Sequence, residues 1–88
     1  MKLEDLRKKI DTYDKKILRI LGMRILLSQE IGRVKETRGI PIEDEKREKE
    51  ILENGEKQAK MLKLDPEFVR KVYKLLLEES KRKQKKRE

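Results

Sequence analysis

Several polar side chains lie on or beside otherwise apolar helix faces, and they are the residues of this sequence best suited to chemistry. They are Arg7, Arg24, Lys35, Asp44, Arg47, Glu48, Ser80 and Gln84. Arg24 is the clearest case, because a guanidinium stays charged when buried and can bind a carboxylate through two parallel hydrogen bonds. If these groups converge inside a helical bundle, their cations, amide, hydroxyl and carboxylates form a site for a small, multiply anionic, hydroxylated ligand.

Each of these residues also has a purely structural interpretation. Arg24 fits an interhelical ion pair or a register-setting position in a dimer seam. Ser80 and Gln84 fit an apolar stripe that runs out into solvent. The charged residues of the second helix fit surface ion pairing, which is common and weak. Arg7 and Lys35 fit cations that extend to solvent beside an apolar stripe.

The element that must position the first of these residues is a long helix over residues 3–36. Its apolar residues recur at alternating steps of three and four, the spacing of a coiled-coil seam. The seam is Leu3, Leu6, Ile10, Tyr13, Ile17, Ile20, Leu27, Ile31 and Val34, interrupted at Arg24. Such a helix spans roughly 50 Å, whereas a compact chain of this size has a radius of gyration of only about 12 Å. We therefore expect a second copy of the chain to cover it.

Two shorter helices are expected at residues 43–61 and 66–83. Gly39 and Pro41 end the first helix, because glycine favours a helix stop and the residue before proline resists helix. Asp65 followed by proline is a typical helix start, with the carboxylate as cap and the proline at the first helical position. The sequence therefore predicts an all-α fold of three helices, long, short and medium.

The same pattern gives no second domain and no internal repeat, so residues 1–88 are expected to form one domain. Gly55 lies inside the second predicted helix and costs about 1 kcal/mol relative to alanine, which suggests fraying or a bend there. The basic run over residues 81–88 is expected to fray at its end.

Composition excludes several classes of function. The chain has 88 residues, no Cys and no His, with 26 Lys plus Arg against 18 Asp plus Glu and a net charge of +8. Thiol nucleophiles, serine-histidine triads and zinc hydrolysis are therefore not expected, and neither is a metal or other cofactor. No apolar run is long enough to span a membrane. We expect a cytoplasmic protein without a membrane partner, and the Lys/Glu-rich composition is typical of thermophiles.

Short motifs follow one another along the chain in a fixed order. They are Leu6-Arg7-Lys8-Lys9-Ile10, Asp14, Gly22-Met23-Arg24, Gly32-Arg33-Val34-Lys35, Pro41, Asp44-Glu45-Lys46-Arg47-Glu48 and Glu78-Glu79-Ser80-Lys81-Arg82-Lys83-Gln84. Each is unspecific alone. In this order and at these spacings, the set resembles the all-helical chorismate mutases of the monofunctional, prokaryotic type over essentially the whole chain. In this comparison the Gly-x-x-Lys motif is a turn that ends the first helix.

The resemblance implies an intertwined homodimer that catalyses the Claisen rearrangement of chorismate to prephenate, on the route to phenylalanine and tyrosine. This pericyclic reaction needs no nucleophile, proton shuttle, metal or cofactor, so a chain without His and Cys can carry it. Catalysis must come from holding a flexible dianion in its reactive shape and from donors placed at the breaking ether oxygen. By resemblance, Lys35 and Gln84 are those donors.

The resemblance also implies roles for the other polar residues. Arg24 and Arg47 clamp the substrate carboxylates, together with Arg7 contributed by the other chain. Glu48 and Asp44 contact the substrate hydroxyl and its surroundings. Ser80 contacts a carboxylate or the backbone. The implied substrate-binding set is Arg7, Arg24, Lys35, Asp44, Arg47, Glu48, Ser80 and Gln84, of which Arg24, Lys35, Glu48 and Gln84 are also catalytic.

Two other functions compete with this one. An isochorismate-pyruvate lyase shares the fold and would split pyruvate from isochorismate to leave salicylate. A basic helical dimer that binds nucleic acid through phosphate contacts would also fit the +8 charge. Against nucleic acid, aromatic residues make up only 3% of the chain, and the basic residues are spread over all three helices.

Overall fold

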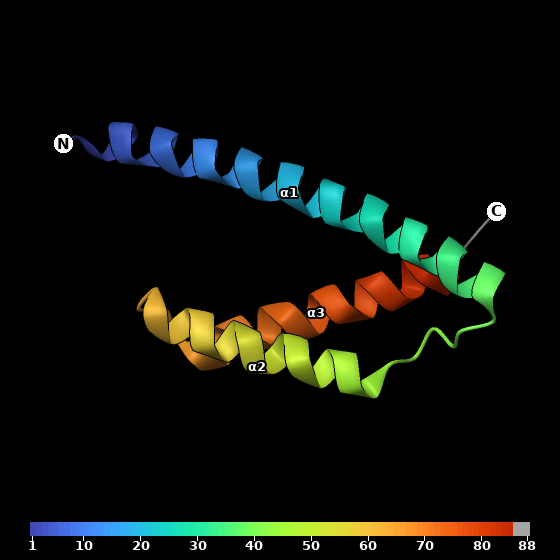
Figure 1. Ribbon diagram of the computed structural model, residues 1–88. Coiled ribbons are helices and arrows are strands. Elements are labelled where there is room, and N and C mark those ends of the chain that lie inside the picture. The colour runs from blue at the N-terminus through green and yellow to red at the C-terminus, as the bar shows by residue number, and fades with distance from the viewer. Residues whose placement is uncertain (86–88) are drawn as a thin grey trace.

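The computed structural model describes residues 1–85, and these form three helices and no strand. The helices are α1 (Leu3–Arg38), α2 (Glu45–Met61) and α3 (Pro66–Lys85), which confirms the predicted all-α fold of one long, one short and one medium helix (Figure 1). The predicted fraying at the end of the basic run falls on residues 86–88, which lie outside the described residues, whereas its first part is helical.

The helix ends follow from local capping chemistry. Gly39 has φ 68°, and its N–H and that of Ile40 donate to the carbonyls of Glu36 and Lys35 at 3.3 and 2.8 Å. This left-handed stop is the one that glycine favours, and it carries α1 two residues beyond its predicted end. At the start of α3, the Asp65 carboxylate accepts from the N–H of Glu67 at 3.0 Å, as predicted.

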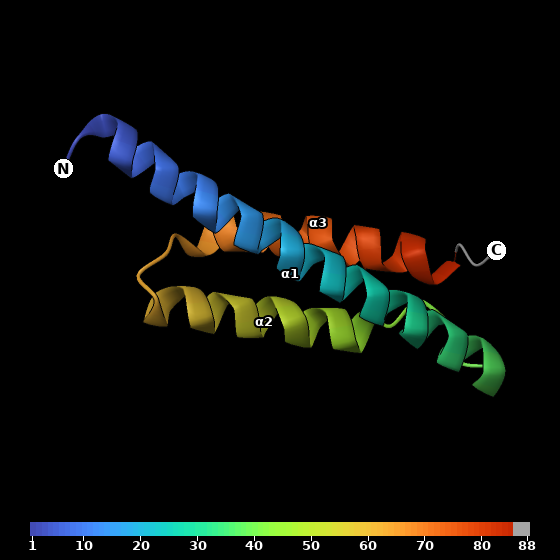
Figure 2. The same cartoon turned by 90° about the horizontal axis from the view of Figure 1, so that it is seen from above.

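Helix α3 is the common packing partner of α1 and α2. Seen from above, α1 crosses the pair formed by α2 and α3 at an angle (Figure 2). At the crossing, a Cβ on Gly32 would lie 2.8 Å from the Cα of Gln84, so the glycine allows the two backbones to approach. Between α2 and α3, a Cβ on Gly55 would lie 2.8 Å from the ring of Tyr73. The predicted fraying at Gly55 is wrong, because α2 is continuous there and the ring packs against the glycine.

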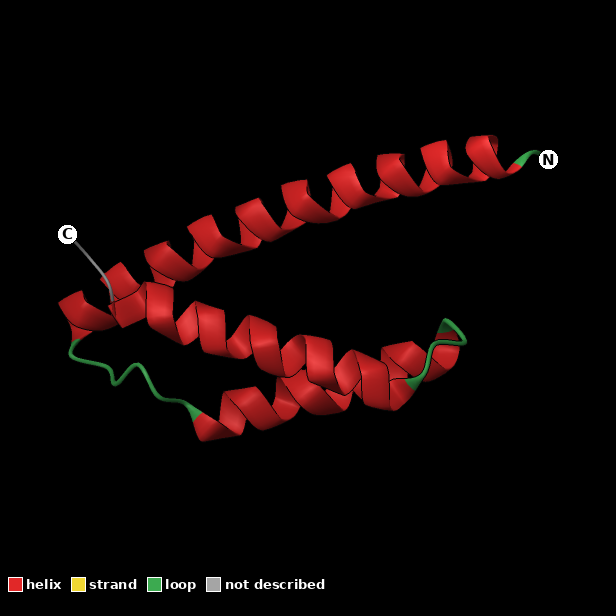
Figure 3. Ribbon diagram, turned by 180° about the vertical axis from the view of Figure 1, so that it is seen from behind, coloured by secondary structure: helices red, strands yellow, loops and turns green. Residues whose placement is uncertain are grey.

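The first half of α1 extends away from the other two helices (Figure 3). All nine apolar residues of its predicted seam remain between 45% and 65% exposed. The radius of gyration is 16.2 Å, well above the roughly 12 Å of a compact chain of this length. The apolar core of one chain is correspondingly small, with Ala59 and Leu77 as its buried apolar side chains. Within residues 1–85, no helix is long and apolar enough to cross a membrane.

Candidate active site

A pocket of about 240 Å³ lies where α1, α2, α3 and the segment joining α1 to α2 meet. It is lined by Arg24, Leu27, Ser28, Ile31, Lys35, Ile42, Asp44, Arg47, Glu48, Ile51, Leu77, Ser80, Lys81 and Gln84. Every polar residue singled out in the sequence lies here except Arg7. The volume is just below the roughly 300–1,000 Å³ usual for small-molecule sites, so one chain encloses room for a small ligand.

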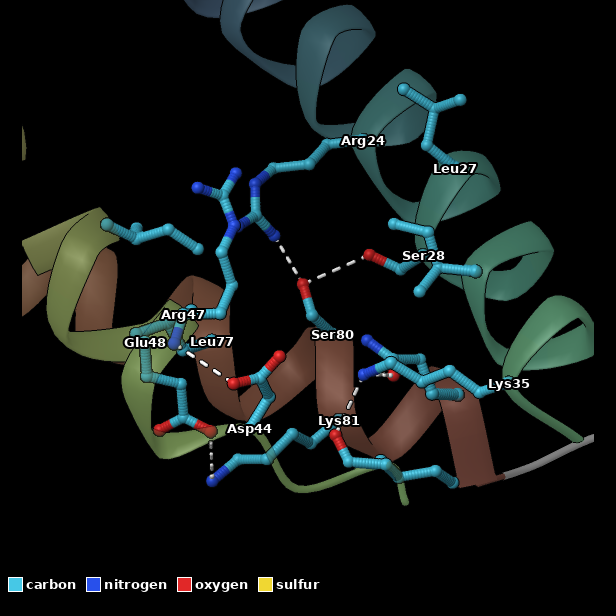
Figure 4. Close-up of a pocket in the computed structure, with 14 residues that line it drawn as sticks. Arg24, Leu27, Ser28, Lys35, Asp44, Arg47, Glu48, Leu77, Ser80 and Lys81 are labelled. Carbon is cyan, nitrogen blue, oxygen red and sulfur yellow. Dashed lines mark hydrogen bonds and ion pairs between the residues drawn. The ribbon is translucent and has the colours of Figure 1, made fainter. Parts of the chain in front are cut away.

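Arg24 reaches from α1 to Ser80 of α3 at the pocket wall. Its guanidinium donates to the Ser80 hydroxyl and to the carbonyl of Leu76, the latter at 3.3 Å. The Ser28 hydroxyl donates to Ser80 Oγ at 3.0 Å (Figure 4). Both serines are buried. The stripe of α3 therefore does not run out into solvent at Ser80, and Arg24 is paired with neutral oxygens rather than with a carboxylate.

Lys35 and Gln84 meet directly in the pocket. Lys35 Nζ donates to Gln84 Oε1 and to the carbonyl of Ile42, both at 2.9 Å. Because an ammonium only donates, the amide oxygen of Gln84 must face Lys35, and its NH2 group must face elsewhere. The expected turn at the Gly-x-x-Lys motif is wrong, since Gly32 and Lys35 lie inside α1. This continuous helix places Lys35 one turn beyond the point where α1 touches the backbone of Gln84.

The start of α2 supplies the opposite wall. Helix α2 begins two residues later than predicted, because Asp44 is its cap and accepts from the N–H of Arg47 at 3.1 Å. Asp44 therefore precedes the helix instead of forming an ion pair along its face. The exposed Arg47 side chain points toward Arg24 from the facing wall (Figure 4). Two guanidinium groups from different helices thus enter one pocket.

Lys81 is a pocket residue that sequence reasoning missed. Its Nζ lies 3.3 Å from Glu48 Oε2 and 3.4 Å from Glu43. The hydrogen bond to the Glu48 carboxylate raises the pKa of Lys81, with a smaller contribution from Glu43. In the sequence Lys81 stands within a basic run, so nothing distinguishes it from its neighbours.

Ser28 was also missed, although the sequence carries a signal for it. It lies four residues after Arg24 and four before Gly32, so all three share one face of α1. A small polar residue between an inward arginine and a close-contact glycine indicates that the face meets another helix.

Arg7 is the one predicted site residue that the structure does not bring to the pocket. It lies in the exposed first half of α1, 17 residues before Arg24, which corresponds to about 25 Å along the helix. Within one chain it cannot contact a ligand that Arg24 holds.

The electrostatics of the pocket favour an anionic ligand. Four cationic side chains line it against two carboxylates, together with hydroxyl and amide groups. Apolar residues from all three helices separate these groups. Among the described residues, no cluster of acidic side chains could hold a metal ion. The arrangement can bind and orient a small dianion and donate hydrogen bonds to an oxygen that gains negative charge.

The fold and the pocket define a class of all-helical proteins in which three helices enclose a pocket rich in cationic side chains. A family model described as chorismate mutase type II matches residues 6–85, and the chain belongs to this family.

Similar proteins agree with that assignment. The chain is 38% identical over 84 residues to a chorismate mutase of Methanocaldococcus jannaschii, covering 96% of this chain and 85% of that protein. It is 39% identical over 71 residues to a bifunctional chorismate mutase/prephenate dehydratase of Aquifex aeolicus, of which it spans 18%. A solved structure of a conserved hypothetical protein from Pyrococcus furiosus aligns with a TM-score of 0.73, at 36% identity and 93% coverage of both chains.

Proposed function

We propose that the protein is a chorismate mutase that rearranges chorismate to prephenate, with residues 1–88 acting as one domain. Membership of the type II chorismate mutase family supports this, as does the named relative of similar length. The observation that carries the proposal at the level of chemistry is the Lys35–Gln84 pair, held at 2.9 Å within a cationic pocket.

The substrate carries two carboxylates, and its reactive shape is compact. Arg24 and Arg47 bind these groups from facing walls of the pocket. Ser80 already receives hydrogen bonds from Arg24 and Ser28, so its own O–H is directed to a further acceptor, such as a substrate carboxylate. The compact, reactive conformer of this flexible dianion is infrequent in solution, and these contacts make it the conformer that is bound.

The bond that breaks joins carbon to the ether oxygen, which gains negative charge in the transition state. Lys35 donates two of its three N–H groups to the carbonyl of Ile42 and to Gln84 Oε1. The third N–H can donate to the ether oxygen, and so can the NH2 group of Gln84. Removing one such donor typically lowers kcat by about 10²–10³-fold. Glu48 and Asp44 carry acceptors for the substrate hydroxyl and its surroundings. No proton transfer or covalent step is required.

We further propose that the active species is an intertwined homodimer. The exposed apolar seam of α1 supports this, since it is a long apolar surface, interrupted at Arg24, that one chain leaves uncovered. An antiparallel partner helix on this seam would bring the partner's Arg7 to the pocket, which explains how an arginine about 25 Å away in its own chain can belong to the site.

The decisive assay offers chorismate and isochorismate separately to the purified protein and identifies the product. We expect prephenate from chorismate. Salicylate and pyruvate from isochorismate, without prephenate from chorismate, would contradict the proposal. Arg24→Leu should lose activity yet melt no lower than wild type, because the part-buried guanidinium is paired only with neutral oxygens and an apolar replacement of such a charge is often neutral or stabilising. A folded Arg24→Leu protein with full activity would remove Arg24 from the site.

A further inference from the structure

Lys81 connects two elements that form opposite parts of the pocket. Its ammonium, on α3, pairs with Glu48 in the first turn of α2 and with Glu43 just before that helix. Three other ion pairs of the described chain each join residues three or four positions apart on one helix, and they are more exposed. The Lys81 and Glu48 side chains are only 28% and 25% exposed, so solvent screens this pair less than a surface pair.

The pair leaves Glu48 able to bind a ligand. Lys81 Nζ lies against Oε2 of the carboxylate, and an ionised carboxylate offers about four acceptor positions on its two oxygens. The other oxygen can therefore accept a hydroxyl from a ligand in the pocket, which both residues line. Without Lys81, the glutamate side chain would have several rotamers available and would lose entropy on binding.

Lys81 also differs from Arg24 and Lys35 in the charge of the groups that it contacts. Arg24 and Lys35 donate to neutral oxygens, so their charges remain available to an anionic ligand. The charge of Lys81 is instead balanced by two carboxylates. It is therefore poorly placed to act as a further clamp for a substrate carboxylate.

We propose that Lys81 is a positioning residue that fixes the Glu48 carboxylate so that it receives the substrate hydroxyl, and that it thereby determines selectivity for a hydroxylated substrate. The proposal rests on the proposed mutase function. It assigns a role to a residue of α3 that is otherwise one of several basic residues near the end of the chain.

The test compares Lys81→Met, Lys81→Arg and the matched control Lys85→Met, which removes the same charge from an exposed position on the same helix. Loss of a hydrogen bond to a charged group should lower kcat/KM for chorismate about tenfold or more in Lys81→Met. Lys81→Arg should recover most of the activity, because the cation is retained. Lys85→Met should stay close to wild type, which separates positioning from general steering by charge.

Two further readouts distinguish positioning from a direct or purely structural role. In a Glu48→Gln background, Lys81→Met should change kcat/KM less than twofold, because residues that act through one another are not additive. The ratio of kcat/KM for chorismate to that for its 4-deoxy analogue should fall in Lys81→Met. This ratio does not depend on the fraction of folded enzyme.

Full additivity in the double variant, or an equal loss with the deoxy analogue, would overturn the role of Lys81. Wild-type protein that turns over neither substrate would instead count against the mutase function, so the two failures are distinguishable.

Discussion

At the level of single residues, the donors of the pocket are oriented by the protein before any ligand binds. Gln84 is buried, and its amide oxygen accepts from Lys35. The nitrogen of the same amide is therefore directed away from the cation, and no alternative assignment of the amide satisfies the ammonium. A donor that is neutral at every ordinary pH is thus fixed beside a charged one, and this has a testable consequence.

Replacing Gln84 by Glu should make activity strongly dependent on pH. A carboxylate cannot donate to the ether oxygen and would repel its developing charge, whereas the protonated acid resembles the amide. Gln84→Glu should therefore be poor at pH 7–8 and recover as the pH falls toward about 5, near the ordinary range of a glutamate. The measurement is kcat/KM against pH for both proteins, with folding checked at each pH. Parallel profiles would show that Gln84 does not donate to the reacting oxygen.

At the level of elements, the sequence predicts the helices well because each helix end is determined by hydrogen bonds between residues close in sequence. The glycine after α1 and the aspartate before α3 act through neighbouring backbone groups, so their positions are readable in the chain. The start of α2 was misplaced because the three-four spacing of Asp44 with Arg47 and Glu48 fits both a helix face and a cap. Lys81 could not be found, since its partner depends on how α3 is rotated against α2, which only tertiary packing decides.

Gly55 is a second feature that only packing explains. Alanine at this position would gain about 1 kcal/mol of helix propensity, but its Cβ would lie 2.8 Å from the Tyr73 ring. Overpacking of this kind costs about 1–3 kcal/mol, so Gly55→Ala should lower the melting temperature. In a Tyr73→Leu background the same substitution should be neutral or stabilising. Thermal unfolding of the four proteins measures this, and equal effects in both backgrounds would show that the ring is not the cause.

The link between α3 and α2 should be visible in alkaline solution. The hydrogen bond to Glu48 raises the pKa of Lys81 above its ordinary value of 10.5. A raised pKa in the folded state means that the pair stabilises the fold fully below pH 10.5 and that this contribution is lost as the pH rises through the higher folded value. Between pH 9 and 12, the melting temperature of wild type should therefore fall more steeply than that of Lys81→Met. Superimposable curves would show that the pair does not link α2 to α3 in solution.

At the level of the whole molecule, a single chain leaves a long apolar helix face exposed to solvent. The apolar seam of its longest helix is left largely exposed by the rest of residues 1–85, and the predicted site residue Arg7 lies in the first half of that helix. The same inference was available from the sequence, because the helix is too long for a compact monomer of this size. A second chain that covers the seam would resolve both features at once.

Mixing two inactive variants tests this arrangement directly. Arg7→Ala and Arg47→Ala should each be inactive, since each removes one cation from every site of a homodimer. After subunit exchange, a heterodimer has one site with both substitutions and one with neither. Random mixing of equal amounts makes half of the dimers heterodimers, so activity should recover to about a quarter of wild type. Exchange is verified independently with differently tagged chains, and each variant incubated alone is the control. No recovery despite verified exchange would show that Arg7 does not act across the dimer, because every site in every mixed dimer would then lack a residue contributed by its own chain.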